Sequence, residues 1–362
     1  MKLFNADALR RATDGERLSA ANDLVQRTLA QHGLAPSTGQ AETGEMPTMP
    51  AMPSLDDMLA RLGGARINAG AAAITLPEGA EFRQDSFTCE AGTRSFRTYV
   101  PASAASGVTG VVVMLHGCTQ TPEDFAAGTG MNALAERHGF VVVYPAQSRG
   151  DNAQSCWNWF SRGDQRRGQG EPAILAGLTA RVCAEFGVGR QNTFVAGLSA
   201  GAAMAVILGE TYDDVFAAVG AHSGLPRGAA KDVPSAFAAM AGNALDAHDL
   251  PAKAGSVRSI VFHGSADSTV HPSNGAAIAR RALAGTAESV QTTAKGETGG
   301  RRFTRVVSSD ADGAARVEHW VIEGQGHAWS GGQAAGSYTD PAGPDASAEM
   351  IRFFFDNTDK AL

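Results

Sequence analysis

The sequence has little of what marks a disulfide-rich, nucleic-acid-binding or membrane-spanning protein. Only four cysteines occur among 362 residues, and their spacing forms no C-x-x-C pair typical of zinc sites. No run of lysine and arginine stands out, and the net charge is −7, so nucleic acid and anionic membrane surfaces are poor partners. The longest strongly apolar runs, 111–115 and 140–144, are far too short to cross a bilayer.

The first residues also lack the apolar core of a secretory signal peptide. Arg10, Arg11, Asp14 and Glu16 interrupt any such stretch. We therefore expect a cytoplasmic protein, with non-classical export as the alternative. Hydrophobic residues make up 43% of the chain and charged residues 19%, which is typical of a globular protein and excludes wholesale disorder.

The chain divides into three parts by composition. Apolar residues recur at helical spacing within 5–33, so residues 1–35 are predicted to form an amphipathic helical segment. Four prolines within 36–53 predict a linker over 36–58, and 59–362 would form the main domain, with a short helix over 54–66. The N-terminal helix is expected to pack on the main domain or on a second copy of the chain, or to dock on a hydrophobic surface such as a storage granule; we favour packing.

Short apolar runs alternate with helical stretches from about residue 82. Residues 82–89 and 95–100 flank Ala91-Gly92 and predict a β-hairpin. The other runs are too uniformly apolar for half-exposed strands, which indicates a sheet buried on both faces. The fold class is therefore α/β, with a mostly parallel central sheet and helices on both faces. Strands are expected at 111–115, 141–145, 193–197, 217–221, 259–263 and 317–323, and helices at 124–138, 170–186, 200–211, 273–284 and 345–356.

A G-x-S-x-G motif joins one of these strands to the following helix. It consists of Gly197, Ser199 and Gly201, and small residues surround the serine. A sharp strand-to-helix turn of this kind projects a nucleophilic hydroxyl out of a sheet, and it requires small neighbours. Ser199 is therefore the predicted nucleophile, against the alternative of an incidental serine in a tight turn.

A serine nucleophile needs a base and an acid that orients the base. His327 follows the strand at 317–323, and Asp267 follows the strand at 259–263, so both lie where a parallel sheet gathers its site. The order Ser199, Asp267, His327 is that of α/β-hydrolases. Other histidines fit less well: His222 and His271 are loop alternatives to the base, whereas His263 and His319 are expected to be structural. Asp310, Asp312 and Asp340 are weaker acids, and Asp267 could also be a turn-forming residue.

An acyl transfer also needs donors for the developing oxyanion. The backbone N–H of Ala200, next to the nucleophile, is the first candidate. The loop after the strand at 111–115 reads His116-Gly117-Cys118-Thr119-Gln120, and its glycine allows close approach of the backbone to substrate. The N–H of Cys118 is the predicted second donor, with Thr119 as the fallback.

Aromatic residues lie close in sequence to these motifs. Trp157 and Trp159 flank Asn158, and Trp329 lies two residues past His327. Flat apolar rings suit an acyl chain, and an amide suits a carbonyl, so Trp157, Asn158 and Trp329 are predicted to contact substrate. The alternative is that two of the three tryptophans belong to the core.

Five segments together resemble the poly(3-hydroxybutyrate) depolymerase family of esterases, which is similar to feruloyl and acetylxylan esterases. They are 115–120 (LHGCTQ), 156–159 (CWNW), 197–201 (GLSAG), 263–267 (HGSAD) and 326–329 (GHAW). The resemblance covers about residues 80–355 and implies an α/β-hydrolase fold and a serine esterase without a metal or other cofactor. It carries Ser199, Asp267 and His327 over as the catalytic triad. It also implies that Cys118 and Cys156 lie close together.

The expected activity is hydrolysis of ester bonds through an acyl-enzyme, on a poly(3-hydroxybutyrate)-type polyester or its oligomers. Feruloyl or acetyl sugar esters and other polyesters are the alternative substrates, and a serine peptidase shares the chemistry. A granule-binding protein on a retired hydrolase scaffold is the alternative outside catalysis.

Overall fold

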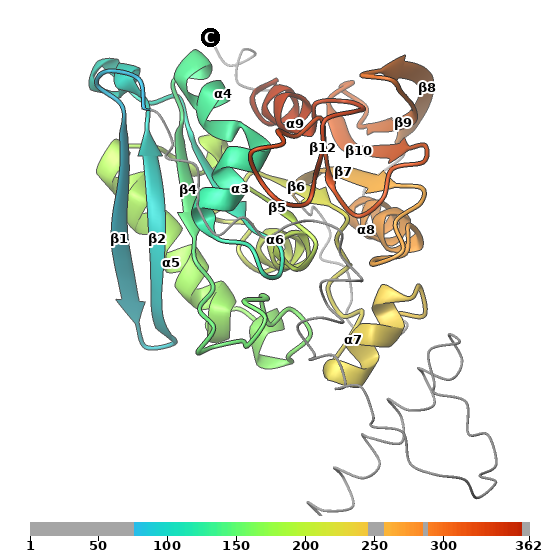
Figure 1. Cartoon of the computed structure of the whole chain (residues 1–362), viewed down its shortest axis with the longest axis horizontal. Coiled ribbons are helices and arrows are strands. Elements are labelled where there is room, and N and C mark those ends of the chain that lie inside the picture. Colours follow the sequence, from blue (N-terminus) through green and yellow to red (C-terminus); the bar gives the residue numbers. More distant parts are fainter. Residues whose placement is uncertain (1–75, 245–256, 285–288, 357–362) are drawn as a thin grey trace, which may run out of the picture. The chain divides into compact units, whose positions relative to one another are not determined.

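One ten-stranded sheet organises the computed structural model, which describes residues 76–244, 257–284 and 289–356 (Figure 1). Its strand order is β1-β2-β4-β3-β5-β6-β7-β10-β9-β8. The strands from β4 to β10 in this order run parallel, and antiparallel hairpins form both edges. The predicted mostly parallel sheet with an antiparallel edge is confirmed.

The sheet strands are β1 (Glu81–Cys89), β2 (Gly92–Val100), β3 (Val111–Leu115), β4 (Val141–Pro145), β5 (Thr193–Leu198), β6 (Ala218–His222), β7 (Arg258–Gly264), β8 (Val290–Thr298), β9 (Arg301–Ser309) and β10 (Ala315–Ile322). A separate pair is formed by β11 (Trp329–Ser330) and β12 (Thr339–Asp340). The α-helices are α3 (Pro122–Thr129), α4 (Met131–His138), α5 (Gly170–Phe186), α6 (Ala200–Thr211), α7 (Val233–Met240), α8 (Ser273–Leu283) and α9 (Ala346–Phe355). Short 3-10 helices are η1 (Ala102–Ser106), η2 (Gly163–Gln165) and η3 (Arg190–Asn192).

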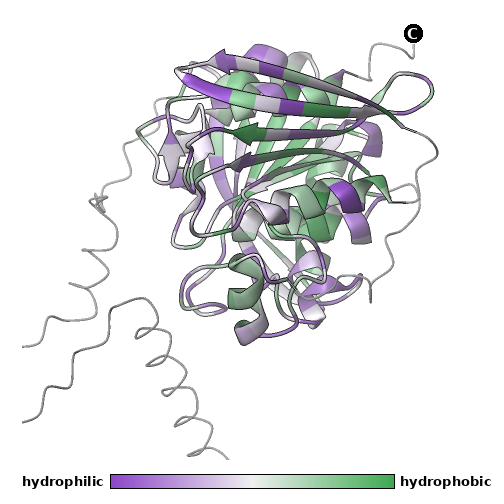
Figure 2. Ribbon diagram, turned by 90° about the vertical axis from the view of Figure 1, so that its right-hand side faces the viewer, coloured by the Kyte–Doolittle hydropathy of each residue, from purple (hydrophilic) through white to green (hydrophobic). Residues whose placement is uncertain are grey.

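Helices cover both faces of the sheet because its central strands are apolar on both sides. In β3, Val113 and Leu115 face a core shared with α5 and α6, whereas Val112 and Met114 face a core shared with α4 and α9. Successive side chains of a strand point to opposite faces, so a continuous apolar run fills two cores. In Figure 2 the inner strands are coloured hydrophobic, and hydrophilic colour gathers on the outer ones.

The helix expected over 124–138 is two helices. Gly130 ends α3 in the left-handed conformation, with φ 64°, and α4 begins at the next residue. A Cβ built on Gly130 would lie 2.5 Å from Nε2 of Gln333, so a glycine at this position also allows the Gln333 side chain to pack closely against it. Glycine tolerates this conformation without steric penalty, which is the physical reason for the correction.

The hairpin of β8 and β9 and helix α7 are the largest described elements that were not expected from the sequence. Gly299 and Gly300 form the hairpin turn, with φ values of 54° and 76°. β8 is exposed along nearly its whole length and carries polar residues, so it lacks the apolar run that marked the inner strands. The N-terminal helix over 5–33, the linker over 36–58 and the short helix over 54–66 lie outside the described residues, and the predicted domain boundaries stay predictions.

Replacement of Phe354 by alanine tests the core on the α9 face. Phe354 is 1% exposed and stacks on Phe194 of β5 with 4.8 Å between ring centroids. Phe354→Ala should lower the free energy of unfolding by about 3–5 kcal/mol, because it removes a buried ring and leaves a cavity. Val290→Ala is the control, since Val290 is 66% exposed and its change should stay within about 0.5 kcal/mol. Equal urea-unfolding midpoints for the two variants would contradict the assignment of Phe354 to the core.

Candidate active site

Ser199 lies at a sharp turn between β5 and α6, as the motif predicts. Its backbone has φ 57° and ψ −119°, a conformation that non-glycine residues rarely adopt. The Ser199 N–H donates to the carbonyl of His222 at the end of β6, over 2.9 Å. The side chain is half-buried, and its Oγ forms no hydrogen bond with any residue in the described ranges.

The two glycines of the motif are required by close backbone contacts. A Cβ on Gly201 would lie 2.0 Å from the Leu115 carbonyl oxygen, and a Cβ on Gly197 would lie 2.5 Å from the Gly201 carbonyl carbon. Real Cβ atoms do not approach backbone this closely, so any larger residue would displace the turn. The motif therefore seats the serine directly against the end of β3, where the His116–Gln120 loop begins.

Asp267 and His327 are joined by a hydrogen bond. His327 Nδ1 lies 2.8 Å from Asp267 Oδ2, and Asp267 is only 4% exposed. A carboxylate accepts, so Nδ1 carries a proton, and in the neutral imidazole Nε2 is then the nitrogen with a free lone pair. β5, β7 and β10 run parallel, so the loops that carry Ser199, Asp267 and His327 leave the same edge of the sheet (Figure 1).

Asp267 serves as a turn residue and as a partner of histidine at once. Its Oδ1 accepts from the N–H groups of Thr269 at 3.0 Å and Val270 at 2.9 Å, which leaves Oδ2 for His327. His263 Nε2 also lies 3.5 Å from Oδ2. Burial by itself would raise the pKa of Asp267, but the hydrogen bonds from His263 and His327 outweigh it and hold that pKa well below its usual range. The carboxylate therefore stays ionised wherever the protein is folded near neutral pH.

The loop that carries His327 is fastened to the loop that carries Asp267. Gln325 accepts from the Ala266 N–H at 3.0 Å through its carbonyl, and the Gly324 N–H donates to Ser265 Oγ at 2.9 Å. Gly264 has no room for a Cβ, which would lie 2.3 Å from the Gln325 carbonyl oxygen. These contacts fix the position of the Asp267 carboxylate relative to the His327 imidazole.

The loop alternatives to the base are engaged elsewhere. Burial lowers the pKa of His222 to about 3, and both of its ring nitrogens have partners, Ser223 Oγ and the Ser330 N–H. Its ring stacks on Trp329, with centroids 5.2 Å apart. His271 is exposed, and its Nδ1 is bonded to Ser273. Among the weaker acids, Asp340 pairs with an arginine, and Asp310 closes a turn.

The loop expected to hold the oxyanion is fixed by a disulfide and by hydrogen bonds. Cys118 and Cys156 form a disulfide, so the proximity that the resemblance implied is confirmed. The N–H groups of Cys118 and Ala200 make no hydrogen bond to a described residue, whereas the Thr119 N–H donates to the Gln154 carbonyl at 2.8 Å. Thr119 is therefore unsuited as the fallback donor, and the pair Cys118 and Ala200 stays the prediction.

Trp157 and Trp329 lie in the core, which was the alternative to substrate contact, whereas substrate contact by the half-buried Asn158 stays a prediction. Trp157 is fully buried and donates from Nε1 to the His116 carbonyl at 3.0 Å, and Trp329 is 1% exposed and donates to Ser347. Both ends of the Asn158 amide are also occupied, because Nδ2 donates to Glu171 and Oδ1 accepts from Asn152. These side chains brace the loops around the site.

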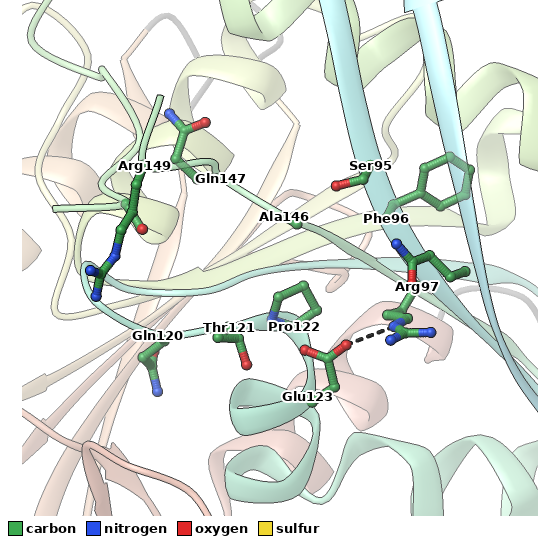
Figure 3. Close-up of a pocket in the computed structure, with 12 residues that line it drawn as sticks. Ser95, Phe96, Arg97, Gln120, Thr121, Pro122, Glu123, Ala146, Gln147 and Arg149 are labelled. Atoms are coloured by element: carbon green, nitrogen blue, oxygen red, sulfur yellow. Dashed lines mark hydrogen bonds and ion pairs between the residues drawn. The ribbon is translucent and has the colours of Figure 1, made fainter. Parts of the chain in front are cut away.

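A cavity of about 320 Å³ lies beside the oxyanion loop (Figure 3). Its walls come from the middle of β2, from the segment that follows β4 and from the start of α3, and polar side chains predominate, including the ion pair of Arg97 and Glu123 at 2.6 Å. Gln120 and Gln147 line it as well. None of the three predicted triad residues is among its lining residues, so we do not assign it to the reacting ester.

Two residues near the site were not anticipated. His263 was expected to be structural, and it is fully buried with Nε2 2.8 Å from the Val270 carbonyl oxygen; the contact of the same Nε2 with the Asp267 carboxylate, at 3.5 Å, was not expected. Tyr338 is 47% exposed, and its hydroxyl lies 3.2 Å from Thr119 Oγ1, beside Cys118. The only sequence signal for His263 is its position at the start of the 263–267 (HGSAD) segment that carries Asp267. Nothing in the sequence places Tyr338 next to Thr119.

Comparison with known proteins assigns a family. A family model described as esterase PHB depolymerase matches residues 94–304, more than half of the chain. The chain belongs to this family. Its relatives include poly(3-hydroxyalkanoate) depolymerase C of Paucimonas lemoignei, 35% identical over 60% of this chain and 54% of the relative. A probable acetylxylan esterase A of Aspergillus clavatus is 31% identical over 49% of this chain and 61% of its own length.

This chain thus spans about half to three fifths of these curated relatives. A solved acetyl xylan esterase from Aspergillus awamori superposes with a TM-score of 0.59 at 20% identity, over 75% of this chain and 98% of that one. The likeness supports the α/β-hydrolase fold, and the resemblance of the motifs to the depolymerase family is confirmed.

The close contact of Gly201 gives a test of the turn. Gly201→Ala should lower the free energy of unfolding by about 1–3 kcal/mol, because its Cβ would overlap the Leu115 carbonyl oxygen and force the turn apart. Gly326→Ala is the matched control beside His327, since a Cβ there meets nothing within 4 Å. Chemical denaturation measures both, and a Gly201 variant as stable as the control would show that the turn is not so constrained.

Proposed function

We propose that this chain hydrolyses carboxylic esters through an acyl-enzyme on Ser199, with His327 as general base and Asp267 as its orienting acid. The hydrogen bond between Asp267 and His327 carries the proposal, since it orients the imidazole with Nδ1 on the carboxylate at the edge where Ser199 stands, so that Nε2 of the neutral ring is free to act as the base. Family membership supports the reaction class.

The reaction divides into two displacements. His327 Nε2 takes the proton of Ser199 as Oγ attacks the ester carbonyl, and the N–H groups of Cys118 and Ala200 stabilise the resulting oxyanion. Collapse of the tetrahedral intermediate expels the alcohol, which takes its proton from the His327 imidazolium. Water then attacks the acyl-enzyme in the same way, with His327 as base, and releases the carboxylic acid and free Ser199. Throughout, the ionised Asp267 stabilises the imidazolium.

The favoured substrate is a polyester of 3-hydroxy acids or its oligomers. A relative whose name states this activity matches more of the chain, at higher identity, than the acetylxylan esterase does. Acetyl or feruloyl esters of carbohydrates are the second candidate, because the acetylxylan esterases share both the sequence match and the fold.

Removal of the proposed nucleophile is the most direct test of the chemistry. Ser199→Ala should lower kcat on a short p-nitrophenyl ester by at least about 10³-fold, with the fold retained, because the variant lacks the hydroxyl on which the acyl-enzyme forms. Ser86→Ala, an exposed serine of β1, is the control and should leave kcat unchanged. A fluorophosphonate should label the wild type at Ser199. Full activity of Ser199→Ala would reject Ser199 as the nucleophile, whereas a wild type with neither labelling nor activity would favour a retired scaffold.

A panel of substrates distinguishes the two substrate classes. We expect release of hydroxy acids from poly(3-hydroxybutyrate) oligomers to exceed release of acetate from acetylated xylan in kcat/KM by at least about tenfold. The reverse order would assign the chain to the carbohydrate esterases of its family.

The compartment and the granule contact stay proposals. The helix proposed to dock on a granule lies outside the described residues, and none of the described helices is long and apolar enough to span a membrane. The disulfide is typical of an oxidising compartment, which opposes the cytoplasmic location expected from the N-terminal residues. Cell fractionation, with thiol trapping to show whether Cys118 and Cys156 are oxidised, distinguishes a cytoplasmic location from an oxidising compartment.

A further inference from the structure

A buried carboxylate behind the oxyanion loop has no part in the proposed reaction. Glu171, near the start of α5, is 5% exposed. Its Oε2 accepts from the Asn158 N–H at 2.8 Å, and its Oε1 accepts from Asn158 Nδ2 at 2.9 Å and from Gln147 Nε2. The guanidinium of Arg94 lies 3.8 Å away. Every neighbour within hydrogen-bond reach of the carboxyl oxygens is thus an N–H donor from one loop.

That loop is bonded in turn to the oxyanion loop. The Gln147 N–H donates to His116 Nε2 at 3.1 Å, and the Gln147 side chain donates to the Cys156 carbonyl at 2.9 Å. His116 Nδ1 donates to the Gly117 carbonyl at 2.7 Å, and Cys156 is joined to Cys118 by the disulfide. Burial lowers the pKa of His116 to about 4, so its ring is neutral and can make both bonds.

We propose that Glu171 is a positioning residue for the oxyanion hole: its carboxylate holds Gln147 and the segment around Asn158, and these hold the backbone of Gly117 and Cys118. The inference rests on the proposed function, in which the Cys118 N–H stabilises the oxyanion. It assigns a role to a residue that touches neither the substrate nor the triad.

The ionised form of Glu171 is the one that fits its neighbours. Protonation would place an O–H among groups that are already donors, and one of the three bonds would be lost. The charged groups that face it are Arg94 from β2, with Asp151 on the far side of that guanidinium, and Asp164 of η2, whose Oδ1 accepts from the Glu171 N–H at 2.7 Å.

Burial raises the pKa of Glu171 to about 7, and the nearby charge of Asp164 raises it further. The hydrogen bonds from Asn158 and Gln147 and the positive charge of Arg94 act in the opposite direction. A falling pH would therefore protonate Glu171 and loosen the oxyanion loop in the range where the enzyme is expected to work.

The test compares Glu171→Gln with the wild type in kcat and KM on a p-nitrophenyl ester between pH 5 and 9. At pH 8–9 the variant should lose about ten- to a hundredfold in kcat with KM little changed, because an oxyanion donor acts in the transition state. The two enzymes should converge toward pH 5–6, where the wild-type carboxyl is itself protonated. Glu185→Gln removes a charge from the exposed end of the same helix and should match the wild type at every pH.

A ratio of wild-type to variant kcat that is constant across pH would overturn the proposal, as would an unchanged kcat. Glu171→Asp covers the case in which the glutamine variant fails to fold: it keeps an ionisable group, so the pH-dependent ratio should persist at a smaller size, and a flat ratio would again contradict the role. Fluorophosphonate labelling of Ser199 separates the two hypotheses. If the wild type is labelled and active but the Glu171 variants keep its kcat at every pH, only this inference is rejected. If the wild type is neither labelled nor active, the proposed function itself is rejected.

Discussion

The hydrogen bond between Asp267 and His327 is the interaction on which the proposed site depends. It joins two loops that are 60 residues apart in sequence, and it exists because β7 and β10 are parallel neighbours whose carboxyl ends meet at one edge. A buried carboxylate with no partner would be costly to keep ionised. Asp267 is buried but bonded to two backbone N–H groups and to His327, so the loops that supply these donors determine both its charge and its direction.

The proposed function places a similar constraint on the loop 116–120, which would present a backbone N–H to the oxyanion. There the disulfide, the neutral ring of His116 and the carboxylate of Glu171 hold the loop from behind. Asp267 and Glu171 are therefore opposite cases of buried acids: hydrogen bonds from histidines lower the pKa of the first, and burial raises that of the second. On this account, the pH dependence of the ratio of wild-type to Glu171→Gln kcat reports the oxyanion loop, whereas Asp267 contributes nothing to that ratio.

Much of the fold could be predicted from the sequence because the central strands are continuous apolar runs. The same regularity placed Ser199, Asp267 and His327 after strands, in short motifs that local geometry requires. The errors in predicting which side chains line the site have a different origin. An aromatic residue next to a motif does not reveal which way its ring turns, so Trp157 and Trp329 were assigned to substrate and lie in the core. Glu171 gave no signal, because its partners come from a loop that only the folded sheet brings to it.

A crystal structure of the chain inhibited with a phosphonate ester would test the central claim most directly. The account predicts a covalent bond from phosphorus to Ser199 Oγ and a phosphonyl oxygen within hydrogen-bond distance of the N–H groups of Cys118 and Ala200. It also predicts His327 Nε2 within reach of Ser199 Oγ while Nδ1 stays on Asp267. Phosphorus on another residue, or an imidazole turned away from Oγ with the inhibitor bound, would contradict it.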